Sequence, residues 1–320
     1  MKLILSRLVQ SVLALLIISA LAFALLAAVG GDALTALRND PRISEQTIEE
    51  LRRVYGLDQP ITARYARWLM DAARGRLSYS FYYQAPVGSI IWPRLLNTAA
   101  LAAAALLIAW PVAFALGVLA ARRPGSRVDY FCSGIILVTS STPRLVLALV
   151  TLSLIARTTL FKTGGAVSDL SAGGWLLRLL PPALVLSVPL VALYLAQTRT
   201  AIGAALNQEF VRVACAKGLP ERVVLVRHAL RAALNPLITI FGYSLGGMMS
   251  GSVVVERVFD WPGLGHLSVV ALRSRDASLL MGVVLVVGAL VLAANLLADL
   301  LLLLNDPRLR ARQPPSSTAR

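Results

Sequence analysis

The sequence predicts an all-α, polytopic membrane protein, and three observations support this fold class. Of the 320 residues, 57% are apolar and 15% are charged, whereas soluble domains hold about 45–50% apolar and about 25% charged residues. Six long runs are almost free of charge, and a helix needs roughly 20 apolar residues to cross a bilayer. The net charge is +15, from 31 Lys and Arg against 16 Asp and Glu. In so apolar a chain this excess indicates cationic cytoplasmic loops rather than a nucleic-acid partner.

The six runs predict six transmembrane helices. Five contain no Asp, Glu, Lys or Arg, and the third is interrupted only by Arg144. In chain order the runs cover residues 8–31, 95–121, 130–156, 179–198, 232–255 and 277–298. The first run follows Lys2 and Arg7, as the core of a secretory signal peptide would. It is longer than the roughly 7–15 residues of such a core and lacks a polar cleavage region, so a retained anchor is favoured over a cleaved signal.

The charges of the loops predict the orientation. The N-terminus, the loops at 122–129 and 199–231 and the C-terminal tail hold 15 Lys and Arg, whereas the two short loops on the other side hold six. Because cytoplasmic loops carry the excess of basic residues, both termini are expected in the cytoplasm. The chain then divides into a cytoplasmic N-terminus with the first transmembrane helix (1–31), an extracytoplasmic loop domain (32–94), a core of five transmembrane helices (95–304) and a cytoplasmic tail (305–320).

The extracytoplasmic segment 32–94 is too long for a simple connection, and its pattern predicts two short helices. Ser44 can cap the first helix, with Ile43 stapled onto Ile48, and Gly56 ends it. A second amphipathic piece covers 62–75. Two interpretations stay open: a helical cap at the membrane surface, or a lid or docking platform at the entrance of a translocation pathway.

The 199–231 loop predicts a compact projection into the cytoplasm. A short helix would end at Gly218, because glycine tolerates the left-handed conformation that closes helices. Pro220 would occupy the first turn of a second helix. The apolar face of that helix would consist of residues at three- and four-residue spacing, Val223, Val226, Leu230 and Leu234. A short helix, a glycine turn and an amphipathic helix suit insertion into a cleft on another protein.

At this loop the sequence resembles the membrane subunits of ATP-binding-cassette importers, whose loop carries Glu-Ala-Ala, three residues and Gly. Gly218 and Ala214 match the glycine and the last alanine, whereas Arg212 and Val213 stand at the positions of the glutamate and the first alanine. Of the later Ile-x-Leu-Pro, residues 228–231 keep only the leucine.

The resemblance is more specific to the peptide branch of that family, the inner-membrane permease subunits of dipeptide, oligopeptide and nickel importers. The branch reads close to Phe-Val-Arg-x-Ala-x-Ala-Lys-Gly-Leu and Arg-His-Ala-Leu-Arg-x-Ala-Leu-x-Pro, as do residues 210–219 and 227–236. Residues 55–69, 259–276 and 305–308 resemble its first outer loop, its last outer loop and its tail. The resemblance covers essentially the whole chain and fits the subunit with the large first outer loop.

The resemblance implies a fold, partners and a function. The chain would be a multi-pass protein of the bacterial plasma (inner) membrane that forms a pathway with a homologous second permease subunit. Two cytoplasmic ATPase subunits and an extracytoplasmic solute-binding protein would complete the importer, with membrane lipid around it, no nucleic acid and no cofactor. The solute would be a di- or oligopeptide, with nickel or another small solute as the alternative. The residues expected to couple to the ATPase are Glu209, Phe210, Arg212, Ala214, Ala216, Lys217, Gly218 and Leu219.

The residues argue against an enzyme, and the prediction is a transport subunit with no catalytic and no metal site. No Gly-x-x-x-x-Gly-Lys-Ser/Thr motif is present, so ATP hydrolysis by that route must come from partner subunits. The two histidines, His228 and His266, form no His-Glu-x-x-His motif, and Cys132 and Cys215 are far apart in the sequence. A transporter driven by an ion gradient is a further alternative, but the spans carry few carboxylates for a proton relay.

The candidate pathway residues are Arg144, Ser244 and Ser250. An arginine at membrane depth is costly, so Arg144 would face the pathway or a partner helix, or snorkel. Ser244 and Ser250 belong to a stretch of small residues at 242–251 that suits either close helix packing or pathway lining. Asp299 is expected to serve a structural pairing or cap.

Overall fold

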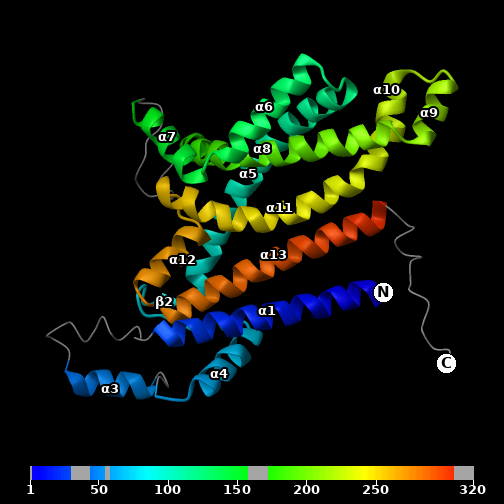
Figure 1. Ribbon diagram of the computed structural model, residues 1–320. Helices are drawn as coiled ribbons and strands as arrows, with labels where there is room; N and C mark the ends of the chain where they lie inside the picture. Colours follow the sequence, from blue (N-terminus) through cyan, green and yellow to red (C-terminus); the bar gives the residue numbers. More distant parts are fainter. Residues whose placement is uncertain (1, 30–43, 55–57, 158–171, 306–320) are drawn as a thin grey trace, which may run out of the picture. The chain divides into compact units, whose positions relative to one another are not determined.

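The computed structural model describes residues 2–29, 44–54, 58–157 and 172–305, and most of them are helical (Figure 1). The chain forms two compact units. Among the described residues, unit 1 comprises 2–29, 44–54, 58–101 and 252–292, and unit 2 comprises 102–157, 172–251 and 293–305. Three helices continue from one unit into the other along the chain: α5 (Val87–Arg122), α11 (Leu230–Val258) and α13 (Ala277–Asn305).

The described helices confirm the all-α, polytopic fold class. Five segments are long and apolar enough to cross a membrane: α1 (Lys2–Val29), α5, α8 (Ala172–Leu206), α11 with the turns before it, and α13. A sixth span exists if α6 (Arg127–Ser141) and α7 (Arg144–Ala156), which meet at 97°, count as one broken span. The number of spans among the described residues is therefore five or six.

The sharp bend between α6 and α7 differs from the single span expected at 130–156. Thr142 and Pro143 have extended backbones, with ψ of 118° and 137°. Pro143 has no N–H for an α6 hydrogen bond, and its ring disfavours the helical conformation of Thr142. Its carbonyl accepts from Val146 N at 3.0 Å and so starts α7. The prolines at 181, 182 and 189, in contrast, lie within the single helix α8.

In unit 1, the segment after α1 forms the two short helices expected from the sequence, α3 (Glu45–Val54) and α4 (Ile61–Ala73). Ser44 caps α3, because its Oγ accepts from Thr47 N at 3.2 Å. The expected staple at Ile43 and the stop at Gly56 lie outside the described residues. The α4 helix packs on α1, where the hydroxyls of Tyr65 and Ser19 are 2.9 Å apart.

A hairpin and a further short helix, α12 (Leu264–Arg273), were not expected from the sequence. The hairpin pairs β1 (Tyr79–Ser80) with β2 (Ala85–Pro86) in antiparallel register. The buried Asp276 holds it to the start of α13, because its carboxylate accepts from Ser80 Oγ at 2.6 Å, from Tyr82 N at 3.1 Å and from Leu279 N at 3.0 Å. Beside these contacts lies an apolar cluster of Val87, Ile91, Leu264, Leu267, Ala271, Leu279 and Val283.

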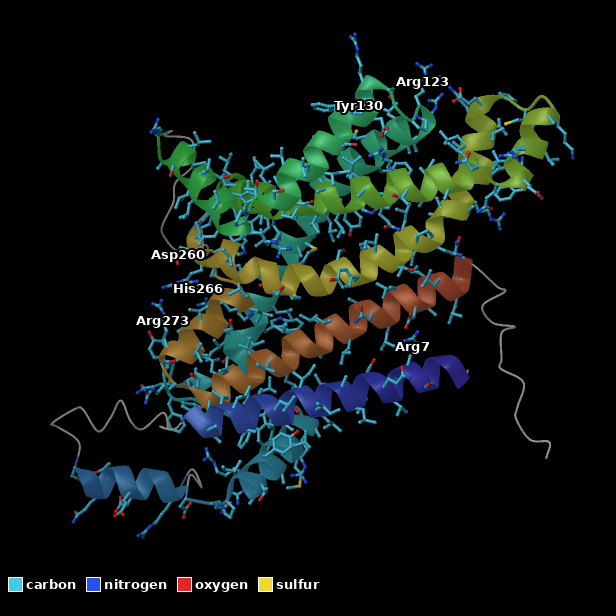
Figure 2. All side chains as sticks on the ribbon, viewed as in Figure 1. Arg7, Arg123, Tyr130, Asp260, His266 and Arg273 are labelled. Carbon is cyan, nitrogen blue, oxygen red and sulfur yellow. The ribbon has the colours of Figure 1, made fainter. Side chains whose placement is uncertain are left out.

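A buried carboxylate joins α12 to α5 and α11. Glu256, near the end of α11, is fully buried and accepts from Thr98 Oγ1 of α5 and from His266 N of α12, each at 2.9 Å. Ser252 and the backbone of Gly265 also donate to it. Figure 2 labels Asp260 and His266 in this connection between α11 and α12.

Glycine is required beside this carboxylate. A Cβ on Gly263 would overlap the carboxylate of Glu256, and a Cβ on Gly265 would lie 2.6 Å from Val253 Cα. Thr98 Oγ1 accepts from Leu264 N at 2.8 Å, so the first turn of α12 is capped by side chains from two other helices. The motif at 259–265 therefore folds around Glu256.

In unit 2, α8 packs against α6 and α7, and small residues permit close contacts between other helices. Gly242 of α11 lies against Ala298 of α13, where a Cβ on the glycine would overlap the alanine Cβ. Gly117 of α5 lies against Thr198 of α8, with a distance of 2.7 Å from its ideal Cβ position to Thr198 Cβ. Part of the small-residue stretch at 242–251 thus serves packing within the chain.

Candidate functional site

The cytoplasmic loop expected from the sequence is a helical projection that follows α8. It consists of α9 (Glu209–Ala216), the single turn α10 (Glu221–Val223) and a π-helix, η2 (Val224–Ala229), which leads into α11. Gly218 closes α9 with φ of +74°, as the sequence predicts. Its N–H donates to Cys215 O at 2.9 Å, and Leu219 N reaches Ala214 O at 3.4 Å. These two bonds form the Schellman motif, which needs the left-handed residue that glycine supplies.

The second helix of the loop differs in detail from the sequence prediction. Pro220 has an extended backbone and precedes α10 instead of lying in its first turn. In η2 the hydrogen bonds run from residue i to i+5, which moves the side chains around the axis relative to an α-helix. Consequently Val224 is buried, whereas Val223 and Val226, expected on the apolar face, are exposed.

One face of α9 packs inward and the opposite face is open. Val211 and Ala214 of α9 form an apolar cluster with Val224 of η2. On the other side Phe210 and Val213 are 43% and 53% exposed, against 4% for Ala214. Ala214 is thus the residue that lets α9 approach η2, while Phe210 and Val213 present an apolar surface to the outside.

The other residues singled out in this loop surround that apolar surface. Glu209 lies in the first turn of α9, where a carboxylate suits the positive end of the helix dipole. Arg212, Lys217 and Leu219 are exposed, so cations border the apolar pair. Ala216 and Gly218 are exposed as well. The resemblance did not mark Val213 as a contact residue, although it is more exposed than Phe210.

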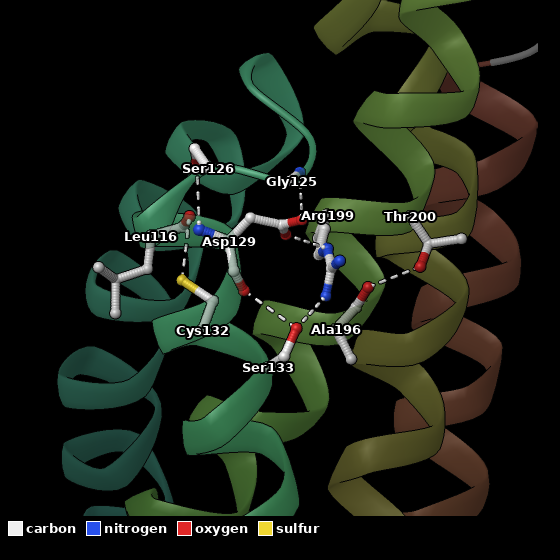
Figure 3. Close-up of polar contacts among 9 residues, drawn as sticks. All are labelled: Leu116, Gly125, Ser126, Asp129, Cys132, Ser133, Ala196, Arg199 and Thr200. Atoms are coloured by element: carbon white, nitrogen blue, oxygen red, sulfur yellow. Dashed lines mark hydrogen bonds and ion pairs between the residues drawn. The ribbon is translucent and has the colours of Figure 1, made fainter.

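Two ion pairs fix the projection and the end of α8 from which it starts. Glu221 of α10 accepts from Arg122 at the end of α5, at 2.9 Å from Nε and 2.7 Å from Nη2. Figure 3 shows a second pair between α6 and α8, in which Arg199 Nε lies 2.7 Å from Asp129 Oδ1. Arg199 also donates to Ser133 Oγ at 2.8 Å, and Gly125 N donates to Asp129 Oδ2 at 2.9 Å. The end of α8 that leads into α9 is therefore fixed to α6.

The three candidate pathway residues occupy two different environments. Arg144, the first residue of α7, is half-buried and its Nη1 lies 3.4 Å from the carbonyl of Gly247 on α11. Ser250 is exposed and donates to the same carbonyl at 3.2 Å. Ser244 is buried instead: it donates to Phe241 O at 2.8 Å, and the hydroxyl of Tyr194 lies 2.6 Å from its Oγ. Arg144 and Ser250 therefore share one surface of α11.

The histidines and cysteines are separated in the described part of the chain. His228 lies in η2 and His266 in α12. Cys132 is buried in α6, where its Sγ lies 3.8 Å from Leu116 O (Figure 3), and Cys215 is exposed on α9. Among residues 2–29, 44–54, 58–157 and 172–305, no three His, Cys, Asp or Glu side chains lie close enough together to hold a metal ion.

The long apolar helices define a multi-pass membrane protein, and the 199–231 loop projects from them. Comparison with known proteins gives the family. Residues 113–311 match the binding-protein-dependent transport system inner membrane component, and residues 1–102 match the N-terminal region of such membrane components. The chain belongs to this family of inner-membrane transport permeases.

Individual relatives cover nearly the whole chain. The oligopeptide transport system permease protein AppB of Bacillus subtilis is 35% identical over 96% of this chain and 98% of its own length. A chain of Brucella suis biovar 1 named as a peptide permease is 36% identical over 88% of this chain and 90% of its own. These relatives confirm the family assignment made from the sequence and the prediction of a transport subunit rather than an enzyme.

Proposed function

We propose that this chain is the membrane permease subunit of an ATP-driven importer of peptides, coupled to its ATPase through α9. The peptide solute rests on the names of the relatives, which are peptide and oligopeptide permeases. The coupling role rests on one observation: the short helix α9 presents Phe210 and Val213 to the outside, although its own inner face is fully packed. Exposed apolar side chains on a projecting helix suit a groove in a partner protein.

The assembly follows from the family and the loop charges. A homologous second permease subunit would complete the pathway, two cytoplasmic ATPase subunits would bind the α9 projections, and an extracytoplasmic solute-binding protein would deliver the solute. The cationic 199–231 loop supports a cytoplasmic position for α9 and both termini. The residues that contact the ATPase are then Phe210, Arg212, Val213, Lys217 and Leu219, with Glu209, Ala216 and Gly218 completing the loop surface and Ala214 supporting it from within.

Force is transmitted because α9 is firmly attached to its neighbours. The cluster of Val211, Ala214 and Val224 joins α9 to η2, and η2 continues into α11. Closure of the ATPase dimer on ATP would move α9, η2 and the start of α11 together and so alternate access to the pathway. ATP shifts this equilibrium because the closed ATPase dimer binds it more tightly than the open one.

The docking surface is tested in the reconstituted importer with its partner permease, ATPases and binding protein. Val213→Glu places a charge on the exposed surface of α9 and is expected to lower ATPase binding and ATP-dependent peptide uptake at least about tenfold, because an unpaired charge at a buried contact is costly. The matched control is Val128→Glu, at an exposed position on α6. Equal binding and uptake in both variants would refute the docking role of α9.

The helix end is tested separately at Gly218. A Cβ there would meet no atom within 4 Å, so any effect of substitution comes from the backbone at φ of +74°. Gly218→Val, which disfavours the left-handed conformation, is expected to uncouple ATP hydrolysis from uptake, whereas Gly218→Asn, which tolerates it, should retain most coupling. Uptake by vesicles that contain this chain alone, without ATP, would instead favour an ion-gradient transporter. If the complete importer took up nickel and no peptide, the solute would be nickel instead of a peptide.

A further inference from the structure

The break between α6 and α7 brings a cationic side chain onto α11. Arg144 is the first residue of α7, directly after Pro143, and α6 and α7 are apolar enough to form one broken membrane span. Within unit 2 the guanidinium of Arg144 crosses to α11, where Nη1 lies 3.4 Å from Gly247 O. An arginine placed within a span is costly unless it serves a partner or an aqueous pathway.

Gly251 and the carbonyl of Gly247, both on α11, form the seat of this guanidinium. Gly247 and Gly251 are four residues apart and therefore share one face of the helix. A Cβ on Gly251 would overlap Nη1 and lie 2.7 Å from Cζ of Arg144. The flat guanidinium thus lies against bare helix backbone, in a space that any larger residue at 251 would fill.

The contacts of the guanidinium leave its charge uncompensated within the described residues of this chain. Its one described hydrogen bond is long, and the acceptor, the neutral Gly247 carbonyl, also accepts from Ser250. Two carboxylates of unit 2 are engaged elsewhere: Asp129 pairs with Arg199, and Glu221 pairs with Arg122. A guanidinium has five N–H donors in a planar fork that matches a carboxylate.

We propose that Arg144 binds a carboxylate of the transported solute, such as the C-terminal carboxylate of a peptide. This inference rests on the proposed function and gives the pathway a chemical preference. The glycine seat holds the guanidinium in place, while its remaining N–H groups are available to the carboxylate as charge-assisted donors. Because the described residues supply one long hydrogen bond and no paired carboxylate, an anionic solute meets no competitor among them. A single arginine also lets the solute leave again.

The test uses the complete importer in proteoliposomes and a pair of peptides that the binding protein binds equally, one with a free C-terminal carboxylate and one with a C-terminal amide. Arg144→Gln is expected to lower ATP-dependent uptake of the free acid about tenfold or more and uptake of the amide less than about twofold. Arg144→Lys keeps the positive charge and should keep part of the preference for the acid. Arg123→Gln, at an exposed arginine of the 122–129 loop, is the matched control.

A second variant removes the seat and leaves the charge. Gly251→Ala places a Cβ where the guanidinium lies and is expected to lower uptake of the free acid selectively. Equal losses for acid and amide in Arg144→Gln would overturn the proposal, because they would assign Arg144 to packing of α7 on α11 or to a carboxylate of the second permease subunit. Unchanged uptake of both peptides would overturn it as well. Absence of ATP-dependent uptake in the wild-type importer would refute the proposed function itself.

Discussion

Removal of the charge at Glu256 should destabilise unit 1 far more than removal of an exposed carboxylate. The two oxygens of this fully buried side chain have different partners: Oε1 accepts from Thr98 and Oε2 from His266 N. In Glu256→Gln one oxygen becomes an NH₂ group. If the NH₂ group faces His266 N, two donors face each other. If it faces Thr98, the hydroxyl can turn to accept from it, but the hydrogen bonds to a charged carboxylate are lost.

The magnitude follows from these contacts. A hydrogen bond to a charged group contributes about 1.5–3 kcal/mol, and a buried donor left without an acceptor costs about 1–3 kcal/mol. We therefore expect Glu256→Gln to lower the free energy of unfolding by about 2–4 kcal/mol, which corresponds to a Tm about 4–8 °C lower. Thr98→Val removes the hydroxyl that donates to Glu256 and accepts from Leu264 N. It should lower the free energy of unfolding as well, but by less.

Thermal unfolding of the detergent-purified chain, followed by tryptophan fluorescence, measures this effect. Trp261 is a suitable reporter because it is buried in the same motif and donates to Asn97 O at 3.1 Å. Glu221→Gln is the matched control, since the side chain of Glu221 is 70% exposed and exposed ion pairs contribute about 0–1 kcal/mol. A Tm for Glu256→Gln within about 1 °C of the control would refute the reasoning.

Two further predictions concern other charged groups. Burial lowers the pKa of His266, with the cations Arg257 and Arg94 acting in the same direction and Asp260 opposing them. Because the unfolded chain then binds the proton more tightly, stability should fall as the pH drops below about 6.5, the ordinary histidine pKa, and His266→Gln should flatten this dependence of Tm on pH. In unit 2, Arg199→Met removes the cation beside Asp129, which keeps its bond from Gly125 N. Because Arg199 is partly exposed, the change should cost about 1–3 kcal/mol, measured as a lower Tm. The double variant Asp129→Asn/Arg199→Met should recover part of that loss. If the losses of unfolding free energy of the two single variants simply added in the double variant, a direct pairing would be contradicted.

Local features of the fold were predictable from the sequence because their causes are local. Runs of uncharged residues are sufficient to place the long helices, since a bilayer requires nothing more specific than length and apolarity. The end of α9 was predictable because Gly218 alone determines it. Ser44 at the start of α3 is a comparable case, in which one hydroxyl satisfies the backbone of its own helix.

Features that depend on distant residues were not predictable. Glu256 and Thr98 are 158 residues apart in the chain, and neither belongs to a repeating pattern. The sequence signal for this cluster was modest: a lone carboxylate at the end of an uncharged run, followed by a motif with two glycines. The π-helix η2 was not predicted either. Three- and four-residue spacing of apolar residues describes an α-helix, and the wider π-turn moves the buried position by one residue.

At the candidate site, motif matching and geometry select different residues. Ala214 matches the family pattern, yet it is buried and serves contact with η2. Val213 departs from the pattern, yet its side chain is exposed. A sequence motif does not distinguish a residue that faces a partner from one that packs the helix in place, because contact with a partner and packing within the chain each limit which side chains fit.

The bond between Ser80 and Asp276 has a consequence for biosynthesis. The two residues are 196 positions apart, so the hairpin of unit 1 cannot acquire its buried anchor until nearly the whole chain has been translated. At about 5–20 residues per second, the hairpin waits about 10–40 s for Asp276 to be made. During that interval Ser80 Oγ and Tyr82 N lack the carboxylate that accepts from them in the folded chain. A ribosome that stalls before α13 therefore leaves unit 1 without this anchor.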